Sequence, residues 1–326
     1  METHNGSDVT GRRQFLARMP LAVTGSALAF SEAASGSNTS AASASPAGPP
    51  LPEIRLGKHR VSRLIAGWNP VAGYSYMGPF MDRHMREYFT LERTIGFLQD
   101  CERNGITAWQ LDHGDKAVGA VRALREQGAQ MKFLCLHSGR DGAAPVDKVV
   151  ADLKPIAIVH HGGATDAMFR RGQSGQVRDF VERVRDAGAM AGVSAHNPDC
   201  IKRVADEGWP VDLFMTCFYY LTRPAEQLEK MVPAKTLQIA HYNFFASDPL
   251  AMTEVARQVD QPCLGFKILA AGRHCGRTQE VAEAFKFAFE HLKPTDGVIV
   301  GMYPRFGDQV RENAQHVRQF ATPHTT

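Results

Sequence analysis

The sequence lacks paired cysteines, a long apolar run after its first 50 residues and a basic stripe. None of its six cysteines stands in a Cys-x-x-Cys pair, so the usual spacing of zinc ligands is missing. No apolar run beyond residue 50 reaches the roughly 20 residues that a membrane span needs. Basic residues do not alternate with aromatic ones, and the formal net charge is only +3. We therefore expect a small-molecule substrate, no nucleic-acid partner and no membrane span in this region.

The first 50 residues resemble an export segment followed by a linker. Arg12 and Arg13 precede the apolar pair Phe15-Leu16, and a short apolar run follows over residues 19–30. This order of charge, apolar run and small residues is similar to a twin-arginine signal. Residues 38–50 are rich in Ser, Ala and Pro, which predicts a flexible lead-in. The sequence thus predicts a periplasmic or secreted protein that engages the twin-arginine export machinery.

Residues 51–326 carry the alternation of strands and helices that is typical of a (β/α)8 TIM barrel. Amphipathic patterns with Gly or Asn-Gly stops predict helices over 91–103, 116–127, 173–187 and 198–207. Near-continuous apolar strands between helices predict a parallel sheet covered on both faces. Eight short runs predict such strands: 62–68, 107–113, 132–137, 156–160, 190–196, 212–218, 264–269 and 297–302. Eight strands of this kind predict closure into one barrel domain.

Two connections are longer than the others. Residues 69–89 follow the first strand as a loop rich in Gly, Met and aromatic residues, and residues 219–248 form a second excursion. The second contains a ninth strand-like run over 236–242. Loops of this length usually serve as lids or binding loops. This first loop has two possible roles. Its aromatic side chains either stack on a sugar-like substrate or pack the loop against the barrel mouth, and the candidates are Trp68, Tyr74 and Tyr76.

Histidines follow four successive predicted strands. They are His113 beside Asp112, His137, the pair His160-His161 and His196. A β/α barrel carries its chemistry on the residues that end its strands. Because side chains alternate along a strand, only one of His160 and His161 can point inward. The sequence therefore predicts an imidazole-rich site at the barrel mouth.

Several short segments, in order, resemble the aldo-keto reductase family. Leu56-Gly57 and 61–64 resemble its opening hairpin and first strand, and 192–196 resembles its fifth strand. Residues 297–301, followed by 310–313, resemble the closing segment that holds the adenosine phosphate of the cofactor. The resemblance runs from residue 56 to residue 313 and implies a TIM barrel that reduces carbonyls with NADPH.

The resemblance fails at two catalytic positions. The family uses a tyrosine, a lysine, an aspartate and a histidine, and Asp112 with His160 or His161 match two of these four. No tyrosine follows Asp112, and the third strand ends at His137-Ser138 without a lysine. The ordinary reductase mechanism would therefore lack its proton donor.

The missing pair favours a metal site as the leading hypothesis. His137, His160 or His161, and His196 would bind a divalent metal ion, with Asp112 or His113 completing the set. His241 is a further candidate ligand. On this hypothesis the protein is an exported enzyme that performs metal-assisted acid/base chemistry on a carbonyl-like or sugar-like molecule. The reaction would be an isomerisation, an elimination or a hydrolysis.

Two alternatives stay open. The first is an NADP-dependent oxidoreductase in which His113, His160 or His161 donates the proton. Its cofactor would contact four polar residues: Arg273, Arg277, Arg305 and Asn313. Lys267, predicted within the seventh strand, would form a Schiff base, bind an oxyanion or point outward between helices. The second alternative is a periplasmic ligand-binding barrel without catalysis.

Overall fold

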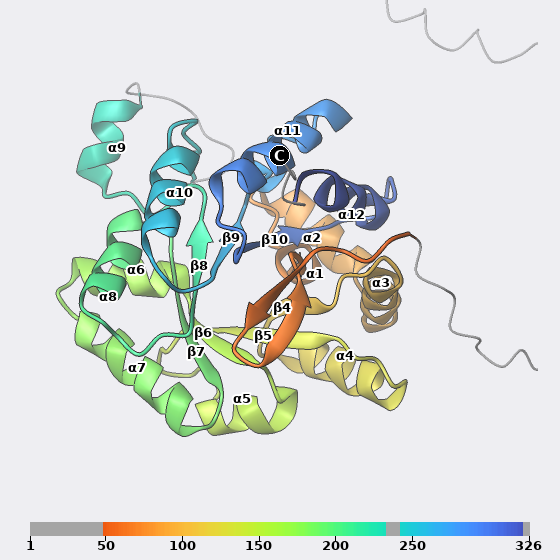
Figure 1. The fold of residues 1–326 in the computed structure, drawn as a ribbon, viewed down its shortest axis with the longest axis horizontal. Helices are drawn as coiled ribbons and strands as arrows, with labels where there is room; N and C mark the ends of the chain where they lie inside the picture. The colour runs from red at the N-terminus through yellow and green to blue at the C-terminus, as the bar shows by residue number, and fades with distance from the viewer. Residues whose placement is uncertain (1–47, 233–241, 322–326) are drawn as a thin grey trace, which may run out of the picture. The chain divides into compact units, whose positions relative to one another are not determined.

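The main part of the chain is a closed barrel of eight parallel strands. A computed structural model describes residues 48–232 and 242–321. Neighbouring strands follow the order β10-β3-β4-β5-β6-β7-β8-β9 around the barrel (Figure 1). The strands are β3 (Leu64–Gly67), β4 (Ala108–Asp112), β5 (Lys132–His137), β6 (Ala157–His160), β7 (Met190–Ala195), β8 (Leu213–Cys217), β9 (Cys263–Phe266) and β10 (Gly297–Gly301). The TIM-barrel fold and all eight predicted strands are confirmed.

Alternation along the strands separates two apolar layers. One face of each strand packs against the surrounding helices, as Trp109 and Val193 do. The other face fills the barrel with small and branched side chains, among them Ala108, Leu134 and Val159. Side chains of a fully buried parallel sheet need apolar partners on both faces, and this explains the near-continuous apolar runs in the sequence.

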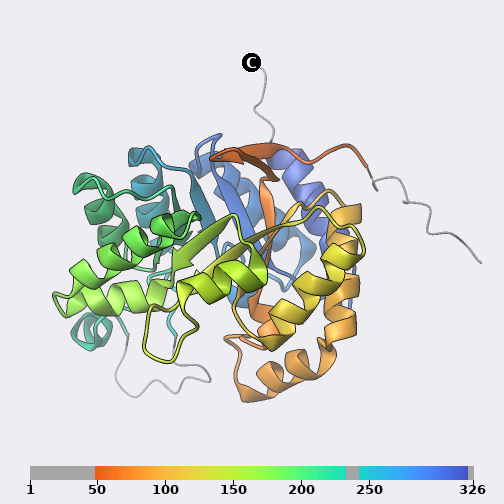
Figure 2. The same ribbon diagram turned by 90° about the horizontal axis from the view of Figure 1, so that it is seen from below.

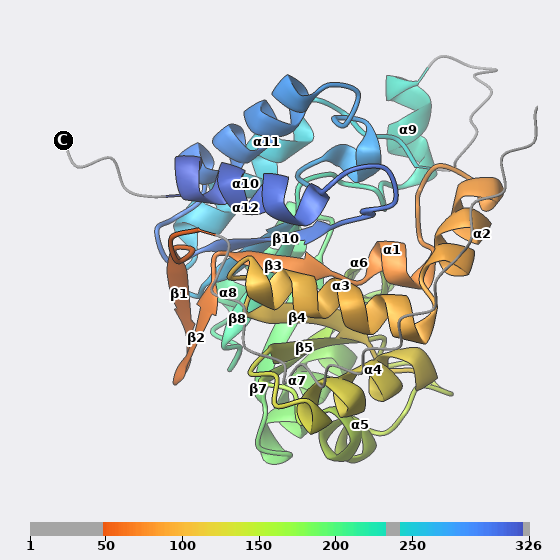
Figure 3. The ribbon, with the colours of Figure 1, turned by 90° about the vertical axis from the view of Figure 1, so that its right-hand side faces the viewer.

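An N-terminal hairpin covers one end of the barrel. Strands β1 (Glu53–Leu56) and β2 (His59–Ser62) pair antiparallel. Their side chains Ile54, Leu56 and Val61 belong to the same buried cluster as the barrel interior. Figure 3 places this hairpin at the end of the barrel opposite α2 and α9. The carboxyl ends of the strands, opposite the hairpin, are therefore the end at which a site can open.

Helices surround the barrel, as Figure 2 shows from below. Their bounds are α1 (Asn69–Ala72), α2 (Pro79–Tyr88), α3 (Leu91–Arg103), α4 (Asp115–Glu126), α5 (Val146–Leu153), α6 (Gly162–Arg170), α7 (Ser174–Asp186), α8 (Pro198–Asp206), α9 (Ala225–Met231), α10 (Asp248–Gln258), α11 (Thr278–His291) and α12 (Gln309–Phe320), with a 3₁₀ turn, η1 (Ala270–Gly272). The four predicted helices are confirmed within a residue of each end. Asn197 caps α8 by accepting from the backbone N–H of Asp199. In the described part of the chain, no helix combines the length and apolar content needed to cross a membrane.

The first long connection differs from the predicted loop, and the second is described only in part. Residues 69–89 are mostly helical, because Pro70 and Pro79 open α1 and α2 at positions where proline favours a helix start. The second connection, 219–248, contains the helix α9 in its described part. Residues 233–241, which include His241 and most of the ninth strand-like run, lie outside the described residues.

The seventh barrel strand is shorter than predicted. It ends at Phe266, because Lys267 adopts a left-handed backbone conformation with φ of 62°. A residue in that region cannot continue a strand. Lys267 therefore lies just beyond the strand, at the barrel mouth.

A buried arginine joins the barrel to the C-terminal helix. Arg63, between β2 and β3, donates to the carbonyl oxygens of Asp296 (2.8 Å), Ala321 (2.6 Å) and Lys293 (3.0 Å). The guanidinium also lies 4.7 Å from the centroid of the Phe289 ring. Burial lowers the pKa of this arginine. Its hydrogen bonds satisfy two buried carbonyls and one that is partly buried.

Substitution of Arg63 should destabilise the fold. In Arg63→Ala the three carbonyl groups lose their donor, so we expect the free energy of unfolding to fall by about 3 kcal/mol. Urea unfolding followed by circular dichroism measures this change. Arg60→Ala is the matched control, because Arg60 pairs with Glu53 at the surface and should change stability by less than about 1 kcal/mol. Equal losses in the two variants would contradict this role of Arg63.

Candidate active site

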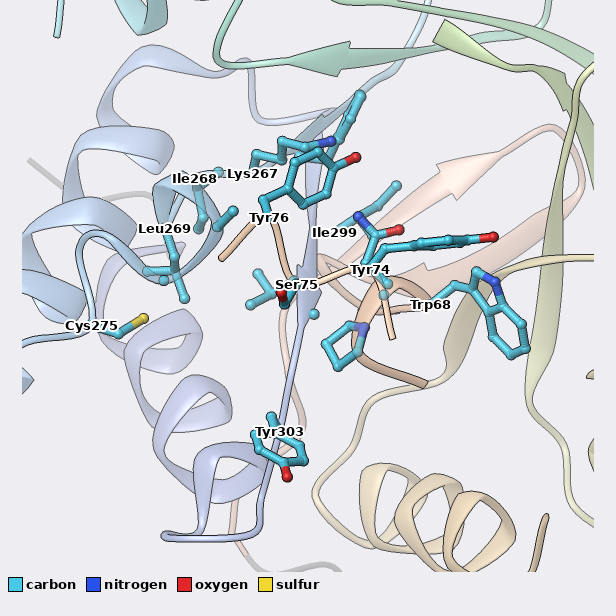
Figure 4. A pocket seen from close by; sticks show the side chains of 18 of the residues that line it. Trp68, Tyr74, Ser75, Tyr76, Lys267, Ile268, Leu269, Cys275, Ile299 and Tyr303 are labelled. Atoms are coloured by element: carbon cyan, nitrogen blue, oxygen red, sulfur yellow. The ribbon is translucent and has the colours of Figure 1, made fainter. Parts of the chain in front are cut away.

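A cavity of about 700 Å³ opens at the carboxyl ends of the barrel strands. Its inner part contains polar side chains from the ends of four strands, β4, β6, β7 and β9: Gln110, His161, Ser194, His196 and Lys267. Apolar and aromatic side chains from the segment after β3 cover it, and Figure 4 shows Trp68, Tyr74 and Tyr76 there, with Lys267 beside Tyr76. The cavity continues to the first turns of α11 and α12. An apolar cavity with a few convergent polar groups is the usual form of a small-molecule site.

Strand alternation decides which predicted histidines reach this cavity. On β6, Ala157 and Val159 point into the barrel, so His161 also faces inward and lines the cavity. His160 faces the helices. On β7, Ser194 and His196 face inward by the same alternation. Two of the predicted metal ligands, His161 and His196, therefore share the site.

The other two predicted ligands lie outside the barrel. His137 donates from Nε2 to the Ala144 carbonyl at 2.7 Å and accepts at Nδ1 from the Gly139 N–H at 3.0 Å. Its ring stacks on Phe180 of α7, with centroids 5.3 Å apart. His160 lies against the same phenylalanine, and its Nδ1 is 2.8 Å from the Thr165 hydroxyl. Both histidines hold the strand ends to α6 and α7.

The predicted metal site is therefore not assembled. Within residues 48–232 and 242–321, no three His, Cys, Asp or Glu side chains are grouped so that they could hold a metal ion. The physical reason is the alternation on β5 and β6, which turns His137 and His160 away from His161 and His196.

The two predicted residues at the end of β4 separate. His113 points toward α5, where its Nε2 is 2.7 Å from Asp152 Oδ2, so it is not available as the proton donor at the mouth. Asp112 has the inward orientation of Ala108 and Gln110, and burial raises the pKa of its carboxyl group to about 7. The cavity lining includes Gln110 but not Asp112.

His196 is held by a buried carboxylate. Asp166 of α6 accepts from the His196 ring Nδ1–H and backbone N–H, both at 3.0 Å, and from the Thr222 hydroxyl at 2.7 Å. Burial lowers the pKa of His196, but interactions with Cys217 and with the Asp166 carboxylate outweigh burial and raise it to about 9. The protonated ring is thus favoured, and its Nδ1 is fixed by Asp166.

Cys217 lies beneath this histidine and is fully buried at the end of β8. Burial raises the pKa of its thiol, but His196 and Lys267 outweigh burial, so the net pKa is below the usual value. His196 and Lys267 therefore favour ionisation of the Cys217 thiol. Cys217 is not part of the cavity lining.

Lys267 forms a pair with Tyr76 across the cavity. Its ammonium nitrogen lies 4.6 Å from the centroid of the Tyr76 ring and 4.6 Å from that of Phe266. The ammonium thus lies over the face of the Tyr76 ring, in a cation–π contact. Burial lowers the pKa of Lys267, but Tyr76 and Cys217 together raise it above its usual value. The cavity therefore contains a phenol in contact with an ammonium.

Strained backbone is concentrated around this pair. Four of the five described non-glycine residues with positive φ lie in the two segments that carry it: Tyr76 (58°), Lys267 (62°), Ala270 (48°) and Ala271 (51°). Each such residue costs on the order of 1 kcal/mol or more, and residues of this kind cluster at functional sites. Arg273 connects the two segments, since its guanidinium donates to the Tyr76 carbonyl at 3.3 Å and packs 3.9 Å from the Phe244 ring centroid.

His161 is the neutral imidazole of the site. Burial, together with the nearby charges of His196 and Lys267, lowers its pKa to about 4. It can therefore accept or share a hydrogen bond at neutral pH without carrying charge. Its position at the end of β6 matches the histidine position implied by the family resemblance.

The four predicted cofactor contacts divide into two pairs. Arg277 and Asn313 line the outer arm of the cavity, together with Thr278, Gln309 and Glu312. Arg273 supports the Tyr76 segment, as described above. Arg305 lies over the rings of Tyr88 and Phe306 and is not part of the lining.

The sequence analysis missed five residues of the site: Gln110, Ser194, Phe266, Asp166 and Cys217. It had assigned Tyr76 only to stacking or packing. Asp166 carried a weak signal, because it stands one helical turn into α6, beyond His161. No sequence signal indicated that Tyr76 and Lys267 form a pair. The two residues are separated by 190 others and come together only because the barrel closes.

Comparisons with protein-family models and with curated proteins found no match. Among solved structures, the chain is similar to a putative aldo-keto reductase from Pseudomonas aeruginosa, with 17% identity, a TM-score of 0.49 and coverage of 83% of this chain and 96% of that one. It is also similar to phospho-2-dehydro-3-deoxyheptonate aldolase from Thermotoga maritima, with 12% identity, a TM-score of 0.50 and coverage of 84% and 74%. At such identities the likeness concerns the TIM-barrel fold and not the reaction.

Proposed function

We propose that this protein is an oxidoreductase that interconverts a carbonyl group and an alcohol with a nicotinamide dinucleotide. One observation carries the proposal. A single cavity connects the Tyr76–Lys267 pair at the barrel mouth with the first turns of α11 and α12. The inner end offers proton chemistry, and the outer arm offers the polar contacts that a dinucleotide needs.

The residues of the outer arm fit such a cofactor. Gly272 and Gly276 line the arm without side chains, which lets a ligand approach the backbone. Arg277 and Thr278 stand at the start of α11, where unpaired N–H groups favour a phosphate. Asn313 is buried in the arm and offers an amide to a base or ribose. When bound, the nicotinamide would supply or accept the hydride.

Tyr76 is the proton donor in this proposal. Its hydroxyl would protonate the carbonyl oxygen of the substrate as the carbonyl is reduced. The Lys267 ammonium beside it stabilises the negative charge that remains on the tyrosine oxygen. The uncharged His161 orients the carbonyl by a hydrogen bond. Thus a tyrosine and a lysine from new positions supply the chemistry that the ends of β4 and β5 lack.

This proposal replaces the metal hypothesis for a geometric reason. Metal-assisted chemistry required three converging ligands, and His137 and His160 are committed to contacts outside the barrel. The ligand-binding alternative without catalysis gives no role to the strained Tyr76–Lys267 pair.

The outer arm should bind nicotinamide nucleotides through Arg277. We expect purified protein to bind NADPH or NADH with micromolar or tighter affinity, measured by nicotinamide fluorescence. Loss of one charge-assisted contact in Arg277→Ala should weaken binding roughly tenfold. Arg178→Ala is the control, because Arg178 is an exposed arginine paired with Glu182 on α7. No binding of either nucleotide would contradict the proposal.

The reaction should depend on the Tyr76 hydroxyl. With 4-nitrobenzaldehyde as a probe substrate, we expect Tyr76→Phe to lower kcat by roughly 10²-fold or more, since general acid catalysis contributes about that much. Nucleotide affinity should stay within a factor of about two, because the aromatic ring is kept. Tyr88→Phe serves as the control at a tyrosine outside the cavity lining. An unchanged kcat in Tyr76→Phe would exclude this residue as the donor.

We also propose that the protein is exported through the twin-arginine pathway. Proteins exported by this pathway often fold around a cofactor before they cross the membrane, which suits a tightly held nucleotide. Replacement of both signal arginines (Arg12→Lys with Arg13→Lys) should leave the full-length protein in the cytoplasm of a host with this pathway. Fractionation with immunodetection measures the distribution. Equal periplasmic amounts of both forms would argue against twin-arginine export.

A further inference from the structure

The ring of Tyr76 is contacted both from the cavity and from outside it. The Lys267 ammonium lies 4.6 Å from the ring centroid on the cavity side (Figure 4). Tyr242 packs against the same ring, with the two centroids 5.0 Å apart and the ring planes inclined by 58°. Tyr76 and Lys267 line the cavity, whereas Tyr242 is not part of its lining. Tyr242 therefore contacts the tyrosine without reaching the space in which a substrate would bind.

The backbone around Tyr76 turns sharply. Tyr76 has a φ of 58°, and Gly73 (77°) and Gly78 (107°) flank it with positive φ. Asp82 of α2 holds this turn, since its carboxylate accepts from the Ser75 N–H at 2.8 Å and from the Ser75 hydroxyl at 2.5 Å. These bonds fix the backbone, but a side chain can still adopt more than one staggered rotamer. The direction of the Tyr76 side chain therefore depends on what its ring packs against.

Tyr242 begins a segment that packs against the same turn. The Phe244 ring lies 4.9 Å from the Tyr219 ring, and the Arg273 guanidinium lies 3.9 Å from the Phe244 centroid. Arg273 also donates to the Tyr76 carbonyl at 3.3 Å. The segment that carries Tyr242 and the turn that carries Tyr76 are thus joined twice, ring to ring and through Arg273.

A buried ion pair fixes the other end of this segment. Asp248 is 4% exposed, pairs with Arg223 and accepts from the backbone N–H of Tyr220 at 3.0 Å. The Arg223 guanidinium lies 4.8 Å from the Tyr220 ring centroid and 4.9 Å from that of Phe245. Breaking a buried pair of this kind is costly, because it leaves one charge uncompensated. The position of Tyr242 is therefore supported by the residues that follow it and not by Tyr76 alone.

From these contacts we propose that Tyr242 is a positioning residue, which holds the Tyr76 ring beside the Lys267 ammonium. The inference rests on the proposed function, in which Tyr76 donates the proton. A proton donor must lie within hydrogen-bond reach of the carbonyl oxygen, so a small displacement of its ring removes much of its catalytic effect. Tyr242 also interacts electrostatically with Lys267, and it thus borders both members of the pair.

A double-mutant cycle tests whether Tyr242 acts through Tyr76. With 4-nitrobenzaldehyde and a nicotinamide nucleotide, we expect Tyr242→Ala to lower kcat roughly fivefold to tenfold, the range that one aromatic pair contributes. In the Tyr76→Phe background the same substitution should change kcat by less than about twofold, because no hydroxyl remains to be positioned. Tyr242→Phe keeps the ring and should retain kcat within about twofold. Nucleotide affinity should stay within about twofold in each variant.

Nitration of Tyr76 by tetranitromethane tests the contact without turnover. Peptide mass spectrometry identifies the modified tyrosine. Loss of the packed ring in Tyr242→Ala should speed nitration of Tyr76 several-fold, whereas Tyr242→Phe should leave the rate unchanged. Met231→Ala is the matched control for both measurements. Met231 lies on α9 in the same excursion, is 44% exposed like Tyr242, and is not part of the cavity lining.

Three results would overturn the positioning role. The first is an equal loss of kcat on Tyr242→Ala with and without the Tyr76 hydroxyl, and the second is an unchanged rate of Tyr76 nitration. The third is a loss in Tyr242→Phe as large as that in Tyr76→Phe, which would make the Tyr242 hydroxyl itself the donor. Faster nitration of Tyr76 in Tyr242→Ala, in a protein that reduces no carbonyl, would support the contact and contradict the proposed function.

Discussion

The alternation of side chains along eight parallel strands is the constraint on which the site depends. In a closed barrel, every second residue of a strand points inward, and a residue cannot change faces without shifting the whole strand. This constraint brings His161, Ser194 and His196 to one cavity. It also turns His137 and His160 toward α6 and α7, where they connect strand ends to helices. The chemistry available at the mouth follows from this division.

Neighbouring groups counteract the effect of burial on the two bases at the mouth. Asp166 and Cys217 raise the pKa of His196, and Tyr76 and Cys217 raise that of Lys267, whereas burial alone would favour the neutral forms. Tyr76 approaches Lys267 from the segment that covers the barrel. The left-handed backbone of both residues shows that the fold expends free energy to bring a phenol and an ammonium together.

Local sequence patterns were enough to predict the barrel, and not enough to predict the site. Apolar strand runs and Gly or Asn stops determine β5 and α3 almost independently of the rest of the chain. The position of Lys267 depends instead on one left-handed residue that ends β9 early, and apolar periodicity does not reveal this. The Tyr76–Lys267 contact depends on closure of the barrel, in which the eighth strand, β10, pairs with both the first, β3, and the seventh, β9. The predicted metal site was wrong because the sequence alone does not show whether a histidine at a strand end faces the cavity or the helices. His137 and His160 face the helices.

We propose that the proton chemistry of this barrel lies with Tyr76 and Lys267 at the inner end of the cavity. A crystal structure of the protein soaked with oxidised NADP would show where a nucleotide binds. We expect the nicotinamide ring at the barrel mouth beside Tyr76 and Lys267, with the adenosine end beside Arg277 and Asn313. A metal ion between His161 and His196, or a cavity without nucleotide at saturating concentration, would contradict it.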